Sequence, residues 1–362
     1  MILALLQKVI LASFDILNDA SVWLVISFIL AGLMHNLLSP DRLHRMLGNK
    51  KISSLVKATL SGMLLPICSC GVIPLGLGLY YSGAYLGPTL AFITATPIIN
   101  PAAILLAYGF LGPQIATIYL IAGFVVPMLI GFAGNALGGR ELHAPSMENP
   151  VERAELEPGE KVTLAQKLSS GLHWGFFDMG ISVSKYVCIG MLLAGLIITL
   201  VPPSLLQQYL GSPGMISLAG IAVLGTIMYI CAVGHIPFIA ALIAGGAAPG
   251  LAITFLMTGA ATNFPELISI YKMIGRRTVI IYATVLILTS FIIGYLTNLY
   301  LLPGFVPFFD LTHTRQTIGL VNNLTFSAPV FLRYICSAVI IALGLHALWP
   351  GVKRLLPKER IA

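Results

Sequence analysis

The chain has 362 residues, of which 57% are hydrophobic and 9% are charged, and its mean hydropathy is +0.94. A soluble domain carries roughly a quarter charged residues, so this composition excludes a soluble protein and indicates a polytopic membrane protein. The net charge of +7 does not indicate nucleic-acid binding, because the basic residues are dispersed in short clusters at the ends of apolar segments.

The N-terminal 23 residues lack the basic start and small-residue cleavage site of a signal peptide. We expect them to form an interfacial helix that leads into a span at 20–38. Further apolar stretches long enough to cross a hydrocarbon core of about 30 Å recur along the chain. Helices must form these spans, because lipid offers the backbone no hydrogen-bond partners.

The sequence repeats itself without a gap at an offset of 163 residues. The aligned positions include residue types that seldom coincide by chance, namely Cys68 with Cys231, Pro74 with Pro237, Asn100 with Asn263, Tyr119 with Tyr282 and Asn135 with Asn298. The pattern predicts two homologous halves, at about 14–138 and 177–301.

The basic residues are distributed oppositely in the two halves. Segment 40–57 carries five Lys or Arg residues, whereas the equivalent segment 203–220 carries no charge. Further along, "YGFLGPQ" from Tyr108 is uncharged, whereas "YKMIGRR" from Tyr271 carries three basic residues. If basic loops stay cytoplasmic, equivalent loops lie on opposite sides of the membrane. This predicts an inverted repeat, an architecture common in secondary transporters.

The predicted fold class is an all-α polytopic membrane protein with two inverted-topology repeats, whose helices are broken by Pro and Gly or form re-entrant hairpins at the midplane. The first transmembrane repeat is expected at 1–138, a cytoplasmic polar linker at 139–176 and the second repeat at 177–301. Residues 302–362 would form an external segment, a final transmembrane helix and a basic cytoplasmic tail. The predicted location is the cytoplasmic (inner) cell membrane, with the N-terminus outside.

Each half contains a long apolar run in which Pro and Gly are expected to interrupt helices. In the first half these residues are Pro66, Gly71, Pro74, Gly76, Gly78, Gly87, Pro88, Pro97 and Pro101. Irregular backbone at membrane depth survives only where protein covers it or where it lines a polar cavity. Paired broken segments therefore predict a binding site, formed here by "PICSCGVIP" and "TATPIINP" with "YICAVGHIP" and "TGAATNFPE".

The predicted substrate-binding residues all lie in these four stretches: Cys68, Ser69, Cys70, Thr96, Asn100, Cys231, His235, Asn263 and Glu266. Cys68, Cys70 and Cys231 are the predicted ligands of a transported metal, because thiolate is a soft donor suited to Cu(I), Zn(II) and trivalent arsenic. The alternative is that a buried thiol packs as a small hydrophobe. We favour packing for Cys188 and Cys336, each of which is isolated on a helical run.

The remaining candidates carry open alternatives. Glu266 either caps a helix or couples transport to protons, and Lys185 is a second ion-coupling candidate. His235 is either a substrate ligand or a hydrogen-bonded structural residue. Asn100 and Asn263 are expected to cap half-helices, to touch substrate, or both.

At "LPICSCGVIPLGLGL" and "TATPIINP" the sequence resembles the predicted permease family that includes organoarsenical efflux permeases and related copper and zinc exporters. The resemblance covers most of the chain and implies an inner-membrane exporter of soft metal or metalloid species. On this chain the motif cysteines are Cys68 and Cys70, and "TPIINP" with Asn100 is the second element. The chain departs from the copper and zinc version in lacking a Cys-rich tail that captures metal.

No GxxxxGK[ST] loop is present, so transport would be of the secondary type. The first hypothesis is efflux of a trivalent organoarsenical or arsenical, or of copper or zinc, through a thiol-lined site. The alternative is a permease for a small organic or sulfur-containing molecule without metal ligation. A membrane thiol oxidoreductase is disfavoured, because one residue rather than two separates Cys68 from Cys70. We expect no enzyme activity and no cofactor. The expected partners are the lipid bilayer and the substrate, and a homo-oligomer is compatible with the sequence.

Overall fold

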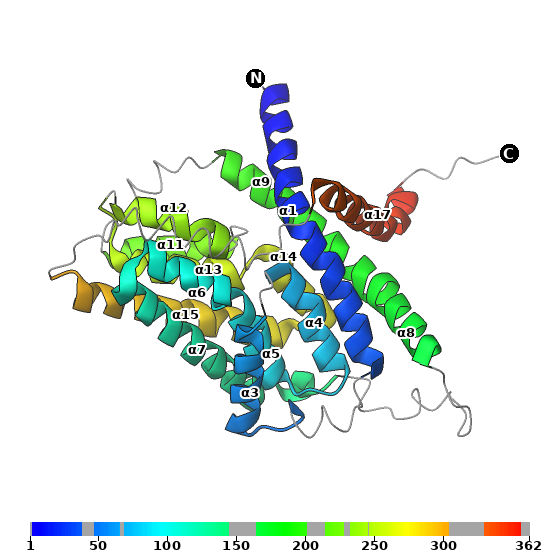
Figure 1. The fold of residues 1–362 in the computed structure, drawn as a ribbon, viewed down its shortest axis with the longest axis horizontal. Helices are drawn as coiled ribbons and strands as arrows, with labels where there is room; N and C mark the ends of the chain where they lie inside the picture. Colours follow the sequence, from blue (N-terminus) through cyan, green and yellow to red (C-terminus); the bar gives the residue numbers. More distant parts are fainter. Residues whose placement is uncertain are drawn as a thin grey trace.

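The computed structural model describes residues 2–37, 47–65, 69–144, 164–200, 214–227, 232–244, 246–303 and 329–355. Every regular element in these ranges is a helix (Figure 1), which confirms the all-α fold class. The first half comprises α1 (Ile2–Leu37), α3 (Ile52–Met63), α4 (Ser69–Tyr81), α5 (Leu86–Ile98), α6 (Pro101–Phe110) and α7 (Gly112–Leu137).

A short turn, η1 (Gly139–Leu142), follows the first half. The second half comprises α8 (Leu164–His173), the π-helical segment η4 (Trp174–Gly180), α9 (Ile181–Leu200), α11 (Met215–Ile227), α12 (Ala232–Ala244), α13 (Pro249–Ala261), α14 (Phe264–Met273) and α15 (Arg276–Leu301). The last helix is α17 (Val330–Leu355).

The helix bounds repeat with the sequence. The helix α4 spans 69–81 and α12 spans 232–244, so both ends recur 163 residues later. The same offset relates α5 to α13 and α6 to α14, and it relates α3 to α11 and α7 to α15 to within one residue. Turn glycines recur as well: Gly83 has φ 111° and Gly246 has φ 96°, a left-handed conformation that glycine adopts without steric cost. The sequence repeat is therefore a repeat of structure.

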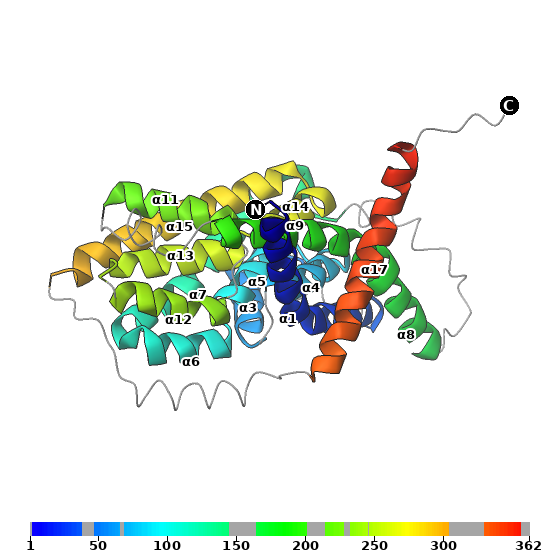
Figure 2. The same cartoon turned by 90° about the horizontal axis from the view of Figure 1, so that it is seen from above.

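The two halves pack through equivalent helices. The helix α5 packs against α13, α7 against α15, and α1 against α9. The two halves also exchange contacts, because α4 packs against α14 and α12 packs against α6. Figure 2 shows α6, α12, α13 and α11 side by side, with α1 and α17 crossing their direction. The largest buried apolar cluster accordingly contains residues of both halves, among them Tyr119, Phe255 and Tyr282.

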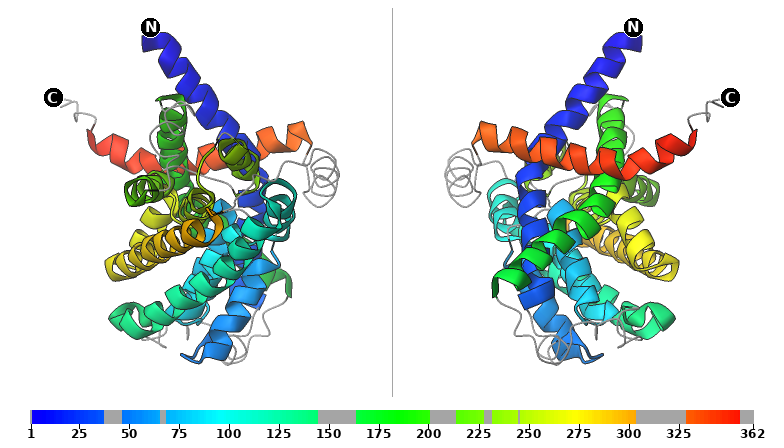
Figure 3. Two further views of the ribbon diagram at one scale, coloured as in Figure 1. Left: turned by 90° about the vertical axis from the view of Figure 1, so that its left-hand side faces the viewer. Right: turned by 90° about the vertical axis from the view of Figure 1, so that its right-hand side faces the viewer.

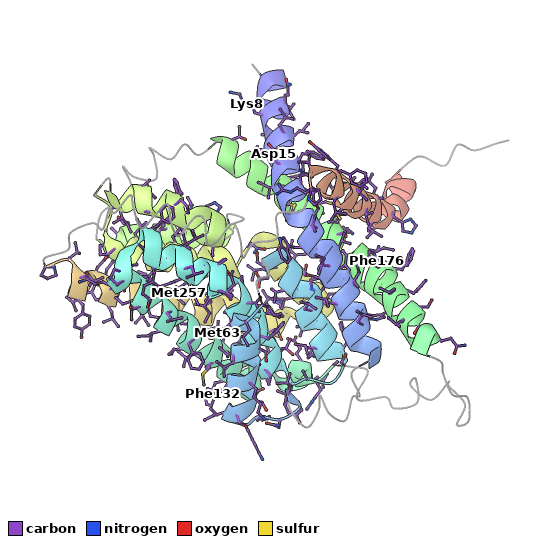
Figure 4. All side chains as sticks on the ribbon, in the orientation of Figure 1. Lys8, Asp15, Met63, Phe132, Phe176 and Met257 are labelled. Carbon is purple, nitrogen blue, oxygen red and sulfur yellow. The ribbon has the colours of Figure 1, made fainter. Side chains whose placement is uncertain are left out.

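Three helices in the described ranges are long and apolar enough to cross a membrane, at Gly112–Leu137, Arg276–Leu301 and Val330–Leu348, and up to six spans result if each bent helix pair counts as one. The outer face of α7 is apolar at intervals of three or four residues, with Ile121, Val125, Leu129 and Phe132 exposed. Figure 4 labels Phe132 at the edge of the molecule. Such a stripe suits contact with lipid, so the described helices form a multi-pass membrane protein.

The interfacial helix and first span predicted at the N-terminus are one continuous helix, α1, whose segments Leu6–Asn18 and Ala20–Leu33 meet at 43°. Its first part protrudes from the helix bundle and carries exposed Lys8 and Asp15 (Figure 4). The second half likewise begins with a long helical stretch, from α8 through η4 to α9.

The expectation that Pro and Gly interrupt helices throughout these runs is wrong for Gly71, Pro74, Gly76, Gly78 and Pro97, all of which lie inside α4 or α5. The glycines instead permit close packing: a Cβ on Gly76 would overlap the side chain of Ile93 in α5. The irregular backbone is confined to short connections such as the one between α5 and α6, which meet at 43°. The equivalent pair, α13 and α14, meets at 44°.

Candidate functional site

The thiol part of the predicted site lies mostly outside the described residues. This applies to Cys68, to Cys231 and to the side chain of Cys70. Ser69 is the first residue of α4 and is buried, with 3% of its surface exposed. The three thiols as ligands of a transported metal therefore stay a prediction, and the described site is built around the two helix breaks.

At each break an asparagine caps the second helix. The Oδ1 of Asn100 accepts a hydrogen bond from the backbone N–H of Ala103 at 2.8 Å. The Oδ1 of Asn263 accepts one from the backbone N–H of Glu266 at 3.0 Å. Both asparagines are buried, with exposed fractions of 5% and 0%. Since membrane interiors offer the first amides of a helix no water, these caps are what makes a break tolerable there.

A tyrosine satisfies the other side of each break. The hydroxyl of Tyr119 in α7 donates to the carbonyl of Ile98, the last residue of α5. The hydroxyl of Tyr282 in α15 donates to the carbonyl of Ala261, the last residue of α13, at 2.5 Å. The sequence analysis aligned these tyrosines in the repeat but did not assign them to the site. Their coincidence at one offset was the available signal.

Glu266 is the one titratable side chain of this break and is fully buried. Its Oε1 lies 2.9 Å from the hydroxyl of Tyr282, and its Oε2 accepts a hydrogen bond from Nδ2 of Asn263 at 3.2 Å. Both neighbours are neutral. The equivalent position in the first half is Ala103, so the carboxyl group distinguishes the two breaks.

Threonine hydroxyls surround this carboxyl group. Thr94 in α5 is hydrogen-bonded to Tyr282, so a residue of the first half joins the cluster of the second half. Thr262 donates to the carbonyl of Thr258 at 2.5 Å and lies 3.3 Å from the hydroxyl of Thr226 in α11. The arrangement is a buried, neutral polar cluster between the halves, consisting of Thr94, Asn263, Glu266 and Tyr282.

Thr96, which the sequence analysis placed in the site, turns its hydroxyl to the carbonyl of Phe92 at 2.8 Å. The hydroxyl also lies at the contact of α5 with α3, where a Cβ on Gly62 would come within 2.9 Å of it. Thr96 therefore supports helix packing in this conformation.

The other candidates lie in two further places. His235 is half-buried in α12, with its ring centroid 6.3 Å from that of Phe255 and 6.5 Å from that of Phe238. Lys185 is half-buried in α9 and lines a separate cavity whose lining does not include Glu266. In the described part of the chain, no three His, Cys, Asp or Glu side chains are grouped so that they would hold a metal ion.

Relatives of the chain carry membrane-permease descriptions or bear no assigned function. The UPF0718 protein MJ0584 of Methanocaldococcus jannaschii is 24% identical over 333 residues, covering 77% of this chain and 91% of the relative. The UPF0718 protein YcgR of Bacillus subtilis is 26% identical, covering 75% of this chain and 91% of the relative. A putative two-component membrane permease complex subunit of Streptococcus mutans is 24% identical, covering 33% of this chain and 41% of the relative.

No solved structure matches the chain. A family model described as a predicted permease matches residues 6–299, which include both helix breaks and the polar cluster between them. That match spans most of the chain and agrees with the multi-pass helical architecture, so the chain belongs to this predicted permease family.

Proposed function

We propose that this protein is a secondary-type efflux permease for a soft metal or metalloid species, with a trivalent organoarsenical or arsenical as the first choice of substrate and copper or zinc as the second. One observation carries the proposal: two matched helix breaks are buried between the halves, and each is satisfied by its own asparagine and tyrosine. Paired broken helices of this kind mark the substrate and ion sites of secondary transporters.

The cysteines supply the preference for a soft substrate. Cys68 immediately precedes α4, Cys70 lies in its first turn, and Cys231 immediately precedes the equivalent helix α12. These two helices contact the broken pair of the opposite half, because α4 packs against α14 and α12 packs against α6. That exchange supports a shared site for the three thiols. A thiolate binds trivalent arsenic, Cu(I) and Zn(II) more strongly than hydroxyl or amide oxygen does.

Glu266 is the proposed proton-coupling group. The hydroxyl of Tyr282 has one hydrogen but two oxygen neighbours, the carbonyl of Ala261 at 2.5 Å and Oε1 of Glu266 at 2.9 Å. If the hydroxyl donates to the closer carbonyl, a proton on Glu266 completes the second contact. Losing that proton would leave an unpaired charge among neutral groups, which is costly in a membrane protein and favours rearrangement of the break.

Growth of a metal-sensitive bacterial host tests the substrate. Expression of the wild-type chain should permit growth on trivalent arsenicals, or on copper or zinc, and should lower the intracellular content of that element. The Cys68→Ser variant should lose both effects at an equal protein level. Protection that survives in Cys68→Ser would contradict thiol ligation and would favour the permease for a small organic or sulfur-containing molecule.

The inverted topology is also a proposal, and contacts at one end of the molecule support it. The N–H of Tyr85 donates to the carbonyl of Leu47 at 3.0 Å, and the Tyr85 ring lies 4.2 Å from that of His143. The carboxylate of Glu141 accepts from the N–H of Thr278 at 2.6 Å. These contacts gather the basic segments near 47–51, 139–144 and 276–278, and we propose that this end faces the cytoplasm.

Cysteine labelling tests that orientation in a cysteine-free background. Lys50→Cys and Arg276→Cys should resist a membrane-impermeant maleimide added outside, whereas Gln114→Cys at the start of α7 should react. Ser212, the second position expected outside, falls beyond the described residues. Labelling of Lys50→Cys and Gln114→Cys from the same side would overturn the inverted arrangement.

A further inference from the structure

A cavity of about 520 Å³ lies between α9, α14 and α17, apart from the helix breaks. Its polar lining comes from three helices: Ser182, Lys185 and Tyr186 from α9, Lys272 from α14 and His346 from α17. The remaining lining residues are apolar or small, and no carboxylate is among them. Two lysines and a histidine thus face one cavity without an acidic side chain in its wall.

The two ammonium groups keep donors available for a ligand. The Nζ of Lys185 lies 5.7 Å from the ring centroid of Tyr186, and the Nζ of Lys272 lies 5.4 Å from that of Tyr271. These are cation–π distances, which orient an ammonium group without using all three of its N–H donors. Two like charges beside one cavity repel each other, so an anion bound there would lower the energy of the arrangement.

The cavity lies at the periphery of the molecule. Its apolar floor belongs to the cluster in which α9 and α17 pack with Met273. The helix α17 approaches α9 closely, because a Cβ on Gly344 would lie 3.1 Å from Sγ of Cys188. In the right-hand view of Figure 3, α17 (orange to red) crosses the outside of α1 (blue) and the green helical stretch that includes α9.

The cavity also lies toward the basic end of the molecule. The carbonyl of Met273, one of its lining residues, accepts a hydrogen bond of 2.5 Å from the hydroxyl of Tyr81, at the C-terminal end of α4. Arg276 and Arg277 follow Met273 within one turn of chain and are exposed. On the lipid side, Leu345, next to His346, has 61% of its surface exposed. A cationic cavity beside exposed apolar side chains suits a ligand with a negative head and apolar chains.

We infer that this cavity binds the phosphate group of an anionic phospholipid, with Lys185, Lys272 and His346 as the residues that contact it. Basic pockets between transmembrane helices commonly hold anionic headgroups. The shared chemistry is that of a phosphate, and the attached acyl chains distinguish a lipid from a free ion. This inference rests on the membrane location and not on the identity of the transported substrate.

The full chain, purified in neutral detergent, should be titrated with fluorescent phosphatidylglycerol and, separately, with fluorescent phosphatidylcholine. We expect the wild type to bind phosphatidylglycerol at least about tenfold more tightly, and the Lys185→Gln/Lys272→Gln variant to lose about tenfold in that affinity, because each lysine near an anionic headgroup contributes on the order of a fewfold. The single variant Lys272→Gln should lose about threefold. It alters an exposed side chain and provides the test if the double variant does not fold.

The matched control is Lys51→Gln/Lys57→Gln, which removes two exposed lysines at α3 that do not line the cavity. It should keep the wild-type affinity. Inorganic phosphate at millimolar concentration should not displace the labelled lipid. Equal affinity of the wild type and the cavity variants, an equal loss in the control, or displacement by inorganic phosphate alone would each overturn the proposal of a lipid headgroup site.

Discussion

The break between α5 and α6 and the break between α13 and α14 share a backbone design but differ in chemistry. At both, an asparagine caps the second helix and a tyrosine bonds the last carbonyl of the first. At the third residue of the second helix, Ala103 stands in the first half and Glu266 in the second. The first half shows that the break forms without a carboxyl group. Helix formation therefore does not account for Glu266, and a buried intramembrane carboxyl group of this kind points to function.

The same comparison separates the thiols. The first half carries Cys70 where the second carries Val233, and Ser69 where the second carries Ala232, whereas Cys68 and Cys231 are equivalent. In our proposal the first half thus contributes more soft donors and the second half contributes the proton carrier. Because each half also packs its α4 or α12 against the broken pair of the other, both sets of groups serve one site.

The largest expected effect follows removal of the thiols of the first half. The double substitution Cys68→Ser/Cys70→Ser should reduce transport of a trivalent arsenical to the background of vesicles without protein, because a hydroxyl is a poor ligand for a soft acceptor. Flux of radiolabelled or mass-quantified arsenic into everted membrane vesicles measures this. The protein level must match the wild type, since an unpaired buried hydroxyl costs about 1–3 kcal/mol.

The control for that experiment is Cys336→Ser. Cys336 is buried on α17 in a small apolar cluster with Val22, far along the chain from the broken helices. Its substitution should lower stability without changing transport per folded molecule. Equal loss of transport in Cys336→Ser would show that packing of any buried thiol, rather than ligation by the motif cysteines, explains the effect.

The next effect concerns the residue by which the two breaks differ. Glu266→Gln keeps an amide that can still bond Tyr282 but cannot release a proton at physiological pH. Transport driven by a pH gradient should fall by about tenfold or more, equivalent to about 1.4 kcal/mol. Substrate exchange without a gradient should persist. Both fluxes can be measured in the same proteoliposomes by setting the internal and external pH.

Glu266→Ala reproduces the first half and separates coupling from folding. Because Ala103 occupies the equivalent place beneath an intact Asn100 cap, this variant should fold with the cap of Asn263 retained. It should share the coupling defect of Glu266→Gln. Gradient-driven transport at the wild-type rate in both folded variants would remove Glu266 from the coupling mechanism.

The smallest expected effect compares the two tyrosines. Tyr119→Phe and Tyr282→Phe each leave a buried carbonyl without its hydroxyl partner, at a cost of about 1–3 kcal/mol. The thermal unfolding midpoints in detergent should therefore fall by similar amounts. Transport should decline further in Tyr282→Phe, because this hydroxyl also contacts Glu266. A transport defect of equal size in both variants would indicate that the tyrosines act only on the backbone.

Much of the frame was predictable from the sequence because its signals are local or repeated. The offset of 163 residues predicted which helices are equivalent, and Asn100, directly before Pro101, indicated a helix start. The glycines of α4 misled the analysis for a physical reason. A glycine signals a break only where the chain needs its flexibility, whereas Gly76 meets the side chain of Ile93 and serves close packing.

The surroundings of Glu266 were not predictable in the same way. Tyr282 lies 16 residues from Glu266 and on another helix, and Thr94 belongs to the opposite half. Helical periodicity relates residues within one helix and does not determine which helices meet. The cationic cavity shows the same limit, since Lys185, Lys272 and His346 come from helices that are adjacent only after folding.

Simultaneous measurement of substrate flux and proton flux in proteoliposomes tests the central claim most directly. Wild-type protein, given a trivalent arsenical and an imposed pH gradient, should accumulate the arsenical while an internal pH dye reports protons moving in the opposite direction. Cys68→Ser/Cys70→Ser should show neither flux, and Glu266→Gln should show arsenical exchange without proton movement. Wild-type arsenical accumulation by the thiol variant, or unchanged proton movement through Glu266→Gln, would contradict the proposal that the two halves divide ligation and coupling between them.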